Sequence, residues 1–386
     1  MTRTRLVRAA LLALVGLLLV PSSGASTGAT RLPTSGGVAT VGQTANGRIA
    51  FADNKTGQVY AVNPDGSGLI QLTHVGTGRF AAQPAWSPDG RHIVFTKLNP
   101  QGFFRLWVME ANGRHKRLLL HARSNAYEFA AEYTPDGRRI VFSEGYALGD
   151  GFAARIDSVR LDGSGLRHLT RLQKPPREAV DAEPSVSPDG RRVVVSRSNG
   201  NVNGRLRQLY LMRIDGSHLH PILSPAWEGW SPEWSPDGRR ITFSSAASRP
   251  FSNVMVMRPS GGHVRRLTRE RFPHQAFESG YSPDGRQIVF VSDHRYPNVC
   301  CTDLFVITAL GTHRTRVDTG LKGVTDPSWG TAPQVTRTSA PLVQHPAEPG
   351  TVWPKRLRGL LDSPGPALWK GSTTWRCCRL ARGAQR

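Results

Sequence analysis

The chain has 386 residues, of which 50 are lysine or arginine and 28 are aspartate or glutamate, so its formal net charge is +22. Such an excess of positive charge favours contact with anionic polymers. An export signal at the N-terminus disfavours nucleic acid as that polymer, and the length allows a large buried core.

The first 25 residues have the pattern of an export signal. Arg3, Arg5 and Arg8 precede an apolar run at residues 9–20, and small residues follow at 21–25. The run is too short to span a bilayer comfortably, which favours a cleaved signal peptide over a membrane helix. We predict cleavage after Ala25, with Ala29 as the second choice and an uncleaved anchor as the open alternative.

The mature protein is therefore expected to be secreted or held in the periplasm or cell envelope. No cysteine follows the apolar run, so lipid attachment at a new N-terminal cysteine is not expected. Residues 26–47 are rich in threonine, serine and glycine without periodicity, which indicates a flexible lead-in.

One five-residue sequence motif recurs through the middle of the chain. It reads Trp-Ser-Pro-Asp-Gly at residues 86–90 and returns, with variations, from Tyr133, Val186, Trp234 and Tyr281; a truncated copy ends the series at 327–330. Proline presets the turn, aspartate bonds to nearby backbone, and glycine accepts a positive φ at the exit. The lead aromatic or apolar residues lie 47 to 53 residues apart, and such a period indicates an array of one supersecondary unit.

Each unit contains the signals of four short antiparallel strands, which is the pattern of a propeller blade. The first unit begins with a second strand at Arg48, whereas the last copy, from Asp326 to Gly330, has only an opening strand. Joined, the two incomplete units make one blade. The predicted fold is therefore all-β, a six-bladed β-propeller over residues 48–330, closed by strands from both ends of the domain.

These WD-like Ser-Pro-Asp-Gly repeats resemble those of the TolB-type β-propeller family. The resemblance covers roughly residues 48–330 and implies protein interaction in the cell envelope. It carries over no partner and no site residue, because this propeller serves as a scaffold for many purposes.

Residues 331–386 have a different composition. They are rich in proline and basic residues and lack the repeat, which predicts a disordered tail. The four cysteines form two adjacent pairs, Cys300-Cys301 and Cys377-Cys378, without the spacing of a zinc site. In an exported protein they could be oxidised, and the sequence leaves their pairing open.

The connections between strands predict where a ligand binds. The turns that join the first strand to the second, and the third to the fourth, are short and uniform. The connections at the opposite face are long and varied, for example 97–105, 143–155, 197–208 and 292–303. Variable loops on a rigid scaffold collect binding residues. Their aromatics, which include Trp227 and Trp230, suit peptide or sugar contacts, with packing between loops as the alternative.

A second candidate site is the position three residues before each lead residue, which should rim the central channel. It is occupied by Gln83, Ala130, Glu183, Ser231, Glu278 and Asp326, and Glu228 lies nearby in sequence. Acidic residues at a channel mouth predict binding of cations or basic peptide segments. The alternative is that they pair with loop arginines such as Arg177, Arg269 and Arg271.

We therefore expect a monomeric module without enzymatic activity, cofactor or metal, which binds an envelope or extracellular protein or peptide through its long-loop face. Nucleic acid is not expected. The arginines that follow the turn glycines are interpreted as solvated turn residues, with contact to an anionic cell-wall polymer as the alternative. No Gly-x-Ser-x-Gly elbow appears. The open alternative is a secreted lyase or lactonase with a metal in the channel, for which His74, His121, His274 and His294 are the loop histidines.

Overall fold

The structure, a computed structural model, describes residues 45–76, 78–120, 125–148, 151–172, 179–198, 207–224, 226–246, 251–296 and 301–333. The predicted signal peptide, almost all of the lead-in, and the tail from residue 334 lie outside this part. Within the described residues, no helix has the length and apolarity that crossing a membrane requires.

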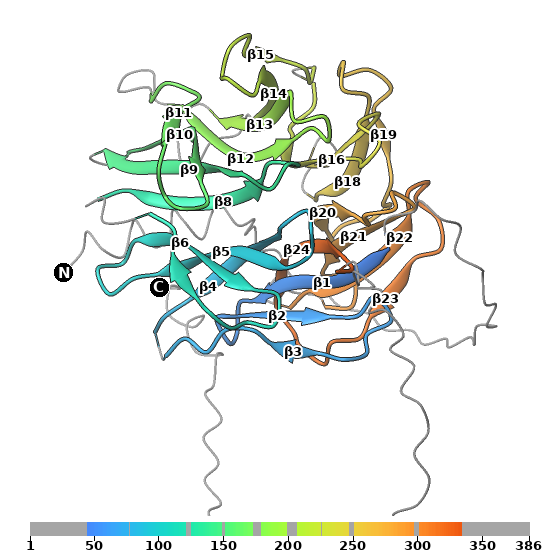
Figure 1. Cartoon of the computed structure of the whole chain (residues 1–386). Coiled ribbons are helices and arrows are strands. Elements are labelled where there is room, and N and C mark those ends of the chain that lie inside the picture. The colour runs from blue at the N-terminus through green and yellow to red at the C-terminus, as the bar shows by residue number, and fades with distance from the viewer. Residues whose placement is uncertain are drawn as a thin grey trace, which may run out of the picture. The chain divides into compact units, whose positions relative to one another are not determined.

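The described residues form four sheets of four strands and one sheet of eight, and strands that follow each other within a unit pair antiparallel (Figure 1). The first two units consist of β1 (Asn46–Asp53), β2 (Gln58–Val62) and β3 (Ile70–Gln71), then β4 (Ala81–Trp86), β5 (His92–Leu98), β6 (Phe104–Glu110) and β7 (Arg117–Leu118). The next two units consist of β8 (Tyr127–Tyr133), β9 (Arg139–Leu148), β10 (Gly151–Arg160) and β11 (Arg167–His168), then β12 (Val180–Val186), β13 (Arg192–Ser198), β14 (Arg207–Arg213) and β15 (His220–Pro221). The last strands are β16 (Trp230–Trp234), β17 (Ile241–Ser245), β18 (Asn253–Met257) and β19 (Arg265–Arg266), then β20 (Ala276–Tyr281), β21 (Gln287–Ser292), β22 (Asp303–Thr308), β23 (Thr315–Val317) and β24 (Val324–Thr331).

The repeated motif forms the predicted turn between the first two strands of a unit. The Ser87 hydroxyl donates to Asp89 Oδ1 at 2.6 Å and accepts from the His92 backbone N–H at 2.8 Å. The Arg91 backbone N–H donates to the same Asp89 oxygen at 3.0 Å, and Gly90 has φ +67°. The other four turns repeat these bonds, with threonine in place of serine at position 134. These hydrogen bonds within the turn explain why the motif recurs.

The two ends of the domain pair as expected. Strand β24 lies beside β1, with Ile49 opposite Trp329 and Ala50 opposite Ser328, and the four-stranded order is β24-β1-β2-β3 (Figure 1). The Trp329 Nε1–H donates to the Gly47 carbonyl at 3.1 Å. Strand β24 therefore supplies the opening strand that the first unit lacks.

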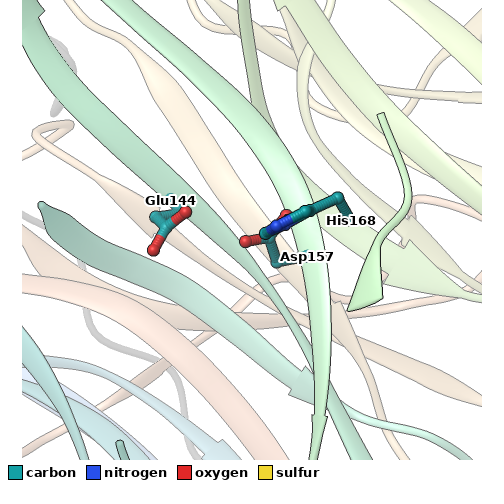
Figure 2. Close-up of side chains that lie close together, drawn as sticks. All are labelled: Glu144, Asp157 and His168. Carbon is teal, nitrogen blue, oxygen red and sulfur yellow. The ribbon is translucent and has the colours of Figure 1, made fainter. Parts of the chain in front are cut away.

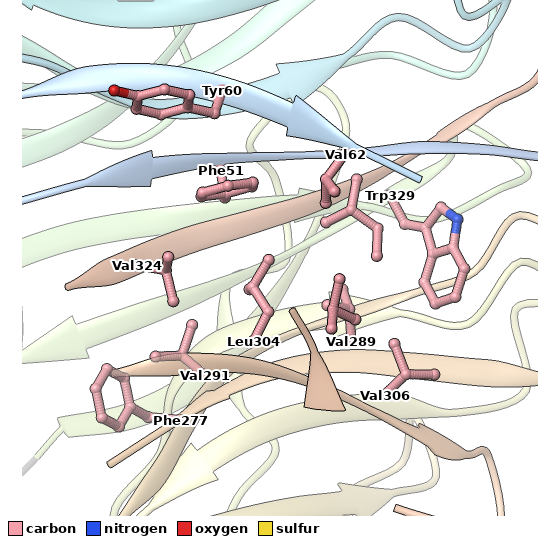
Figure 3. Packing of buried hydrophobic residues seen from close by; sticks show 12 residues of the cluster. Phe51, Tyr60, Val62, Phe277, Val289, Val291, Leu304, Val306, Val324 and Trp329 are labelled. Atoms are coloured by element: carbon pink, nitrogen blue, oxygen red, sulfur yellow. The ribbon is translucent and has the colours of Figure 1, made fainter. Parts of the chain in front are cut away.

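The core lies between neighbouring sheets. Figure 3 shows Phe51, Val62 and Trp329 of the first sheet packed with Val289 and Leu304 of the adjacent sheet. All five are buried. Because each apolar face is covered by the next sheet, a unit cannot bury its core alone.

One expected loop is mostly strand. The sequence predicts a long connection at residues 143–155, but β9 continues to Leu148 and β10 begins at Gly151, with these two residues opposite each other. The extension is held by a buried cluster that includes Tyr127, Phe129 and Phe152. At its end, Ala154 pairs in parallel with Val180, which joins two units into one eight-stranded sheet.

Candidate functional site

The position three residues before each lead residue has an unusual backbone. Its six residues all have positive φ, between 46° and 54°, although none is glycine. They are Gln83, Ala130, Glu183, Ser231, Glu278 and Asp326, and we call them the bulge residues. The pairing of the inner strand with its partner shifts at these positions, as in a β-bulge. A bulge re-aims a side chain, and here it directs several of them at the next unit.

The bulge side chains hold neighbouring inner strands together. Gln83 Oε1 accepts from the Ala130 N–H at 3.0 Å, Glu183 Oε2 from the Ser231 N–H at 2.7 Å, and Glu278 Oε2 from the Asp326 N–H at 2.8 Å. The Asp326 carboxylate accepts from the Gln83 N–H. At a bulge, a backbone N–H group loses its hydrogen-bond partner on the adjacent strand. Here the side chain of the neighbouring unit replaces that partner, because a buried N–H group needs a hydrogen-bond acceptor.

Two more hydrogen bonds join units not yet linked, and a third joins β24 to β4 a second time. The Val186 N–H donates to Glu132 at 2.9 Å, the Glu278 N–H to Ser244 Oγ at 2.9 Å, and the Trp86 N–H to Ser328 Oγ at 3.3 Å. The last of these bonds joins β4 of the first complete unit to β24.

A cavity of about 410 Å³ lies among the inner strands. All six bulge residues line it, and so do Glu132 and Glu233, so five carboxylates face one space. Its lining, drawn from the described residues, contains no lysine, arginine or histidine. The lining starts at the bulge residues and reaches Pro88, Pro236 and Pro283 of the turns. It therefore extends towards the edge of the sheets that carries the uniform turns.

The carboxylates in the cavity are half-buried, and four of them have raised pKa values. Burial raises the pKa of Glu233 to about 8 and that of Asp326 to about 6. Burial, together with the neighbouring Glu233, raises the pKa of Glu132 well above its usual range. For Glu278, burial and the charge of Asp326 raise the pKa in the same way. A cationic ligand would lower all four values, because it stabilises the charged form.

The predicted site residues separate into two groups. Gln83, Glu183, Glu278 and Asp326 come together in the cavity lining, whereas Trp227, Glu228 and Trp230 are not part of it. Trp227 packs against the cluster that contains Leu223 and Trp234, and the Arg207 guanidinium lies 5.9 Å from the Trp230 ring centre. These contacts fit packing between neighbours, the alternative interpretation, and ligand binding by the two tryptophans stays a prediction.

The alternative pairing of the acidic bulge residues with loop arginines is not found in the described part of the chain. Neither Arg269 nor Arg271 makes an ion pair there with Glu183, Glu278 or Asp326. Arg177 lies outside the described residues.

Sequence reasoning missed a buried acidic pair on the outer strands. Glu144 and Asp157 are fully buried, and His168 Nδ1 lies 3.0 Å from Asp157 Oδ1 (Figure 2). The three side chains could hold a metal ion by distance alone. However, the Arg155 guanidinium already bonds both carboxylates, so the protein supplies its own cation there. No motif spacing reveals this cluster, because pairing of β9 with β10 brings it together.

The loop histidines are placed outside the cavity lining. His294 Nδ1 lies 2.9 Å from Glu270, and His274 Nδ1 lies 3.8 Å from Asp293. His121 lies outside the described residues, as do all cysteines except Cys301. The Cys301 thiol accepts from Lys55 Nζ at 3.3 Å.

Comparison with known proteins identifies relatives of this chain. The family model of the TolB beta propeller domain matches residues 43–229. The Tol-Pal system protein TolB of Anaeromyxobacter dehalogenans is 30% identical over 186 residues, which are 48% of this chain and 39% of that protein. Dipeptidyl-peptidase 5 of Porphyromonas endodontalis is 32% identical over 116 residues, 30% of this chain and 16% of the relative. The chain thus spans well under half the length of these curated relatives.

Solved structures agree on the fold. The crystal structure of TolB from Acinetobacter baumannii matches with a TM-score of 0.59 and 17% identity, over 74% of this chain and 66% of that one. The structure of a putative TolB from Agrobacterium tumefaciens matches with a TM-score of 0.51 and 19% identity, over 72% and 90% of the two chains. Residues 43–229 therefore match the TolB beta propeller domain, and the solved structures agree with that fold.

Proposed function

We propose that this chain is an exported, non-enzymatic binding module whose six units close into a ring around the cavity, and that a protein or peptide partner in the cell envelope places a cationic group in it. The observation that carries the proposal is the cavity lining, with five carboxylates and no basic side chain among the described residues. A carboxylate removed from bulk water attracts a cation more strongly than one on an open surface.

The entrance for this group is proposed at the turn edge, although the sequence favours the long-loop face for the partner. The cavity lining begins at the bulge residues and runs to the turn prolines, so a side chain has its path from that side. The long loops remain a second contact surface for the same partner. Membership of one relative in the Tol-Pal system fits a protein-binding role.

The metal-dependent lyase or lactonase is the weaker candidate. The cavity lining offers carboxylates without a histidine among the described residues, and the loop histidines lie elsewhere. Borderline metals such as zinc prefer imidazole or thiolate ligands in proteins. The described cavity therefore does not fit a zinc-type centre, and its carboxylates would suit only a hard cation such as Ca²⁺ or Mn²⁺.

Affinity capture from a native envelope extract tests the proposal. One bait is the wild-type protein, and a cavity variant combines Glu183→Gln, Glu278→Gln and Asp326→Asn, which removes charge but keeps hydrogen-bond acceptors. A loop variant combines Trp227→Ala with Glu228→Gln. The expected result is a protein retained by the wild type and the loop variant and lost from the cavity variant.

Other outcomes have defined meanings, provided that circular dichroism shows all baits folded. Loss of the partner from the loop variant alone would place the contact on the long-loop face. Equal retention by all three baits would contradict a role for the cavity. Capture of no protein by the wild type would contradict the binding function.

A further inference from the structure

The turn edge carries a second feature that the cavity does not explain, a series of exposed arginines. One arginine follows the glycine of each Ser/Thr-Pro-Asp-Gly turn, and all five are exposed. They are Arg91, Arg138, Arg191, Arg239 and Arg286, and we call them the turn arginines. None of them makes an ion pair with a carboxylate in the described part of the chain.

The aspartate in each turn does not neutralise its arginine by direct contact. Asp136 Oδ1, for example, accepts from the Thr134 hydroxyl at 2.6 Å and from the Arg138 backbone N–H at 3.0 Å. These bonds to the carboxylate hold the pKa of Asp136 below its usual range. The charge of Arg138 also lowers this pKa, but no ion-pair contact between the two side chains is found in the described residues, so the exposed guanidinium can reach another anion.

The turns of different sheets stand next to one another. A Cβ atom on Gly190 would lie 4.0 Å from Pro135, one on Gly238 would lie 3.8 Å from Pro188, and one on Gly285 would lie 3.6 Å from Pro236. The turns of Arg138, Arg191, Arg239 and Arg286 therefore belong to one continuous surface. A ligand that reaches several of them must be extended, because each arginine comes from a different unit.

The turns between third and fourth strands add positive charge to the same edge. Their exposed basic residues include Arg114, Arg160, Arg167, Arg213 and Arg258. Arg117 and Arg265 instead donate to carbonyls of the next unit, Leu161 at 2.7 Å and Leu310 at 3.1 Å, and so help to hold the edge together.

Three arginines inside the strands differ from the turn arginines because they have carboxylate partners. Arg197 bonds Asp181 at 2.5 Å, Arg105 lies 3.7 Å from Glu128, and Arg155 bonds two carboxylates. Carboxylates thus bind these three guanidinium groups, and no such partner is found for the turn arginines in the described part of the chain. An exposed arginine without an ion pair therefore recurs at the same place in five units.

We infer that the turn edge binds a linear phosphate-bearing polymer of the cell wall, with one phosphate group at each of several turn arginines. The planar guanidinium donates two parallel hydrogen bonds to a phosphate, and binding at several turns adds the separate contributions. This inference does not depend on the cavity or its partner.

A membrane is the less suitable occupant. Binding at a lipid interface needs an apolar surface beside the charge. Among the described residues, Leu69 and Leu310 are the large exposed apolar side chains in turns of this edge. Leu310 is 68% exposed and Leu69 38%, and two single side chains offer little apolar area to a bilayer.

Two variants with the same change in net charge test the inference. The turn-edge variant carries Arg138→Gln, Arg191→Gln, Arg239→Gln and Arg286→Gln. The control carries Arg79→Gln, Arg171→Gln, Arg269→Gln and Arg271→Gln, four exposed arginines in the connections at the opposite edge. The probe is purified poly(glycerol phosphate), and binding to the full-length protein is measured by fluorescence polarisation across a salt series.

The turn-edge variant should lose on the order of tenfold or more in affinity, and its slope of log K against log salt should fall by about three, while the control keeps the wild-type slope. Equal loss in both variants would show attraction by net charge alone and overturn the inference. Stronger binding of the wild type to polygalacturonate, to single-stranded DNA or to phosphatidylglycerol vesicles would overturn the assignment to a cell-wall phosphate polymer.

Discussion

At the scale of single residues, Glu233 shows how the cavity shapes stability. Its carboxylate makes no hydrogen bond among the described residues, and burial raises its pKa to about 8. The folded protein therefore holds this proton more tightly than the unfolded chain does. Between the ordinary value near pH 4.5 and about pH 8, the free energy of unfolding should fall as pH rises.

We expect Glu233→Gln to remove this loss. The variant should unfold like the wild type at pH 4.5 and should be more stable at pH 8.5, by about 1–2 kcal/mol after allowance for the access of water to the cavity. Urea unfolding at both pH values measures the difference. Glu228→Gln, outside the cavity lining, serves as the control. If Glu233→Gln were no more stable than the wild type at pH 8.5, the carboxylate would not be destabilised there.

At the Gln83 bulge we expect a glycine substitution to be less destabilising than an alanine substitution, which is the reverse of the usual order in a strand. Gln83→Ala removes the bond to the Ala130 N–H and keeps a side chain at φ +50°. Gln83→Gly removes the same bond but tolerates that φ. The glycine variant should therefore be the more stable of the two, by about 1 kcal/mol.

Ala82, the preceding residue in β4, provides the comparison for Gln83. It is buried and has no positive φ, so Ala82→Gly should destabilise the protein as glycine normally does in a strand. Thermal unfolding of the three variants gives the ranking. If Gln83→Gly melted below Gln83→Ala, backbone strain at the bulge would be ruled out.

At the scale of elements, the extended hairpin of β9 and β10 depends on one glycine and one ring. A Cβ atom on Gly145 would lie 2.2 Å from Cζ of Phe152, whose side chain is buried. Phe152→Ala should cost about 3–4 kcal/mol through the cavity it leaves, and Gly145→Ala about 1–3 kcal/mol through the clash.

The double variant distinguishes this contact from two independent effects. Alanine at 152 leaves room for the new methyl group at 145, so the double variant should be more stable than the sum of the single losses predicts. Chemical denaturation of the wild type, the two single variants and the double variant gives the four free energies of unfolding that this double-mutant cycle needs. Additive losses would mean that the ring does not occupy the space beside Gly145.

At the scale of the whole molecule, β24 joins the two ends of the domain. It pairs with β1 and contributes Val324 and Trp329 to the core between two sheets (Figure 3). A chain that ends at Gly323 should melt far below a chain that ends at Pro333, because it loses this core and exposes the edge of β1. Differential scanning calorimetry compares the two; both lack the tail, so its contribution cancels. Equal melting temperatures would contradict closure of the ring by this strand.

Much of the fold was predictable because the determining signals are local and repeated. Ser-Pro-Asp-Gly specifies its own turn through bonds within six residues, as at Ser87, Asp89 and His92, and its period places one unit after another. The pairing of residues 326–330 with the first unit followed from counting strands. By contrast, the loop predicted at 143–155 was wrong, since Phe152 is held in a strand by aromatic residues far along the chain.

The candidate site was predictable in position but not in geometry. A constant offset from the lead residue was enough to select Gln83, Glu183, Glu278 and Asp326, which share one cavity. The sequence does not reveal their positive φ, because that conformation depends on a backbone donor in the next unit. Nor does it place Trp227, which packs against residues of other strands, or Trp230, whose ring lies beside the Arg207 guanidinium.

The sequence by itself thus determined the all-β repeat, its turns and the residues offered to the channel, because each rests on bonds between close neighbours in the chain. Only the tertiary structure decided which charges remain unpaired. Arg197 has a carboxylate partner on the adjacent strand and Arg191 has none among the described residues, although both belong to the same unit. Ion pairing requires two side chains within about 4 Å, and that distance is set by strand register and the neighbouring sheet rather than by position in the chain.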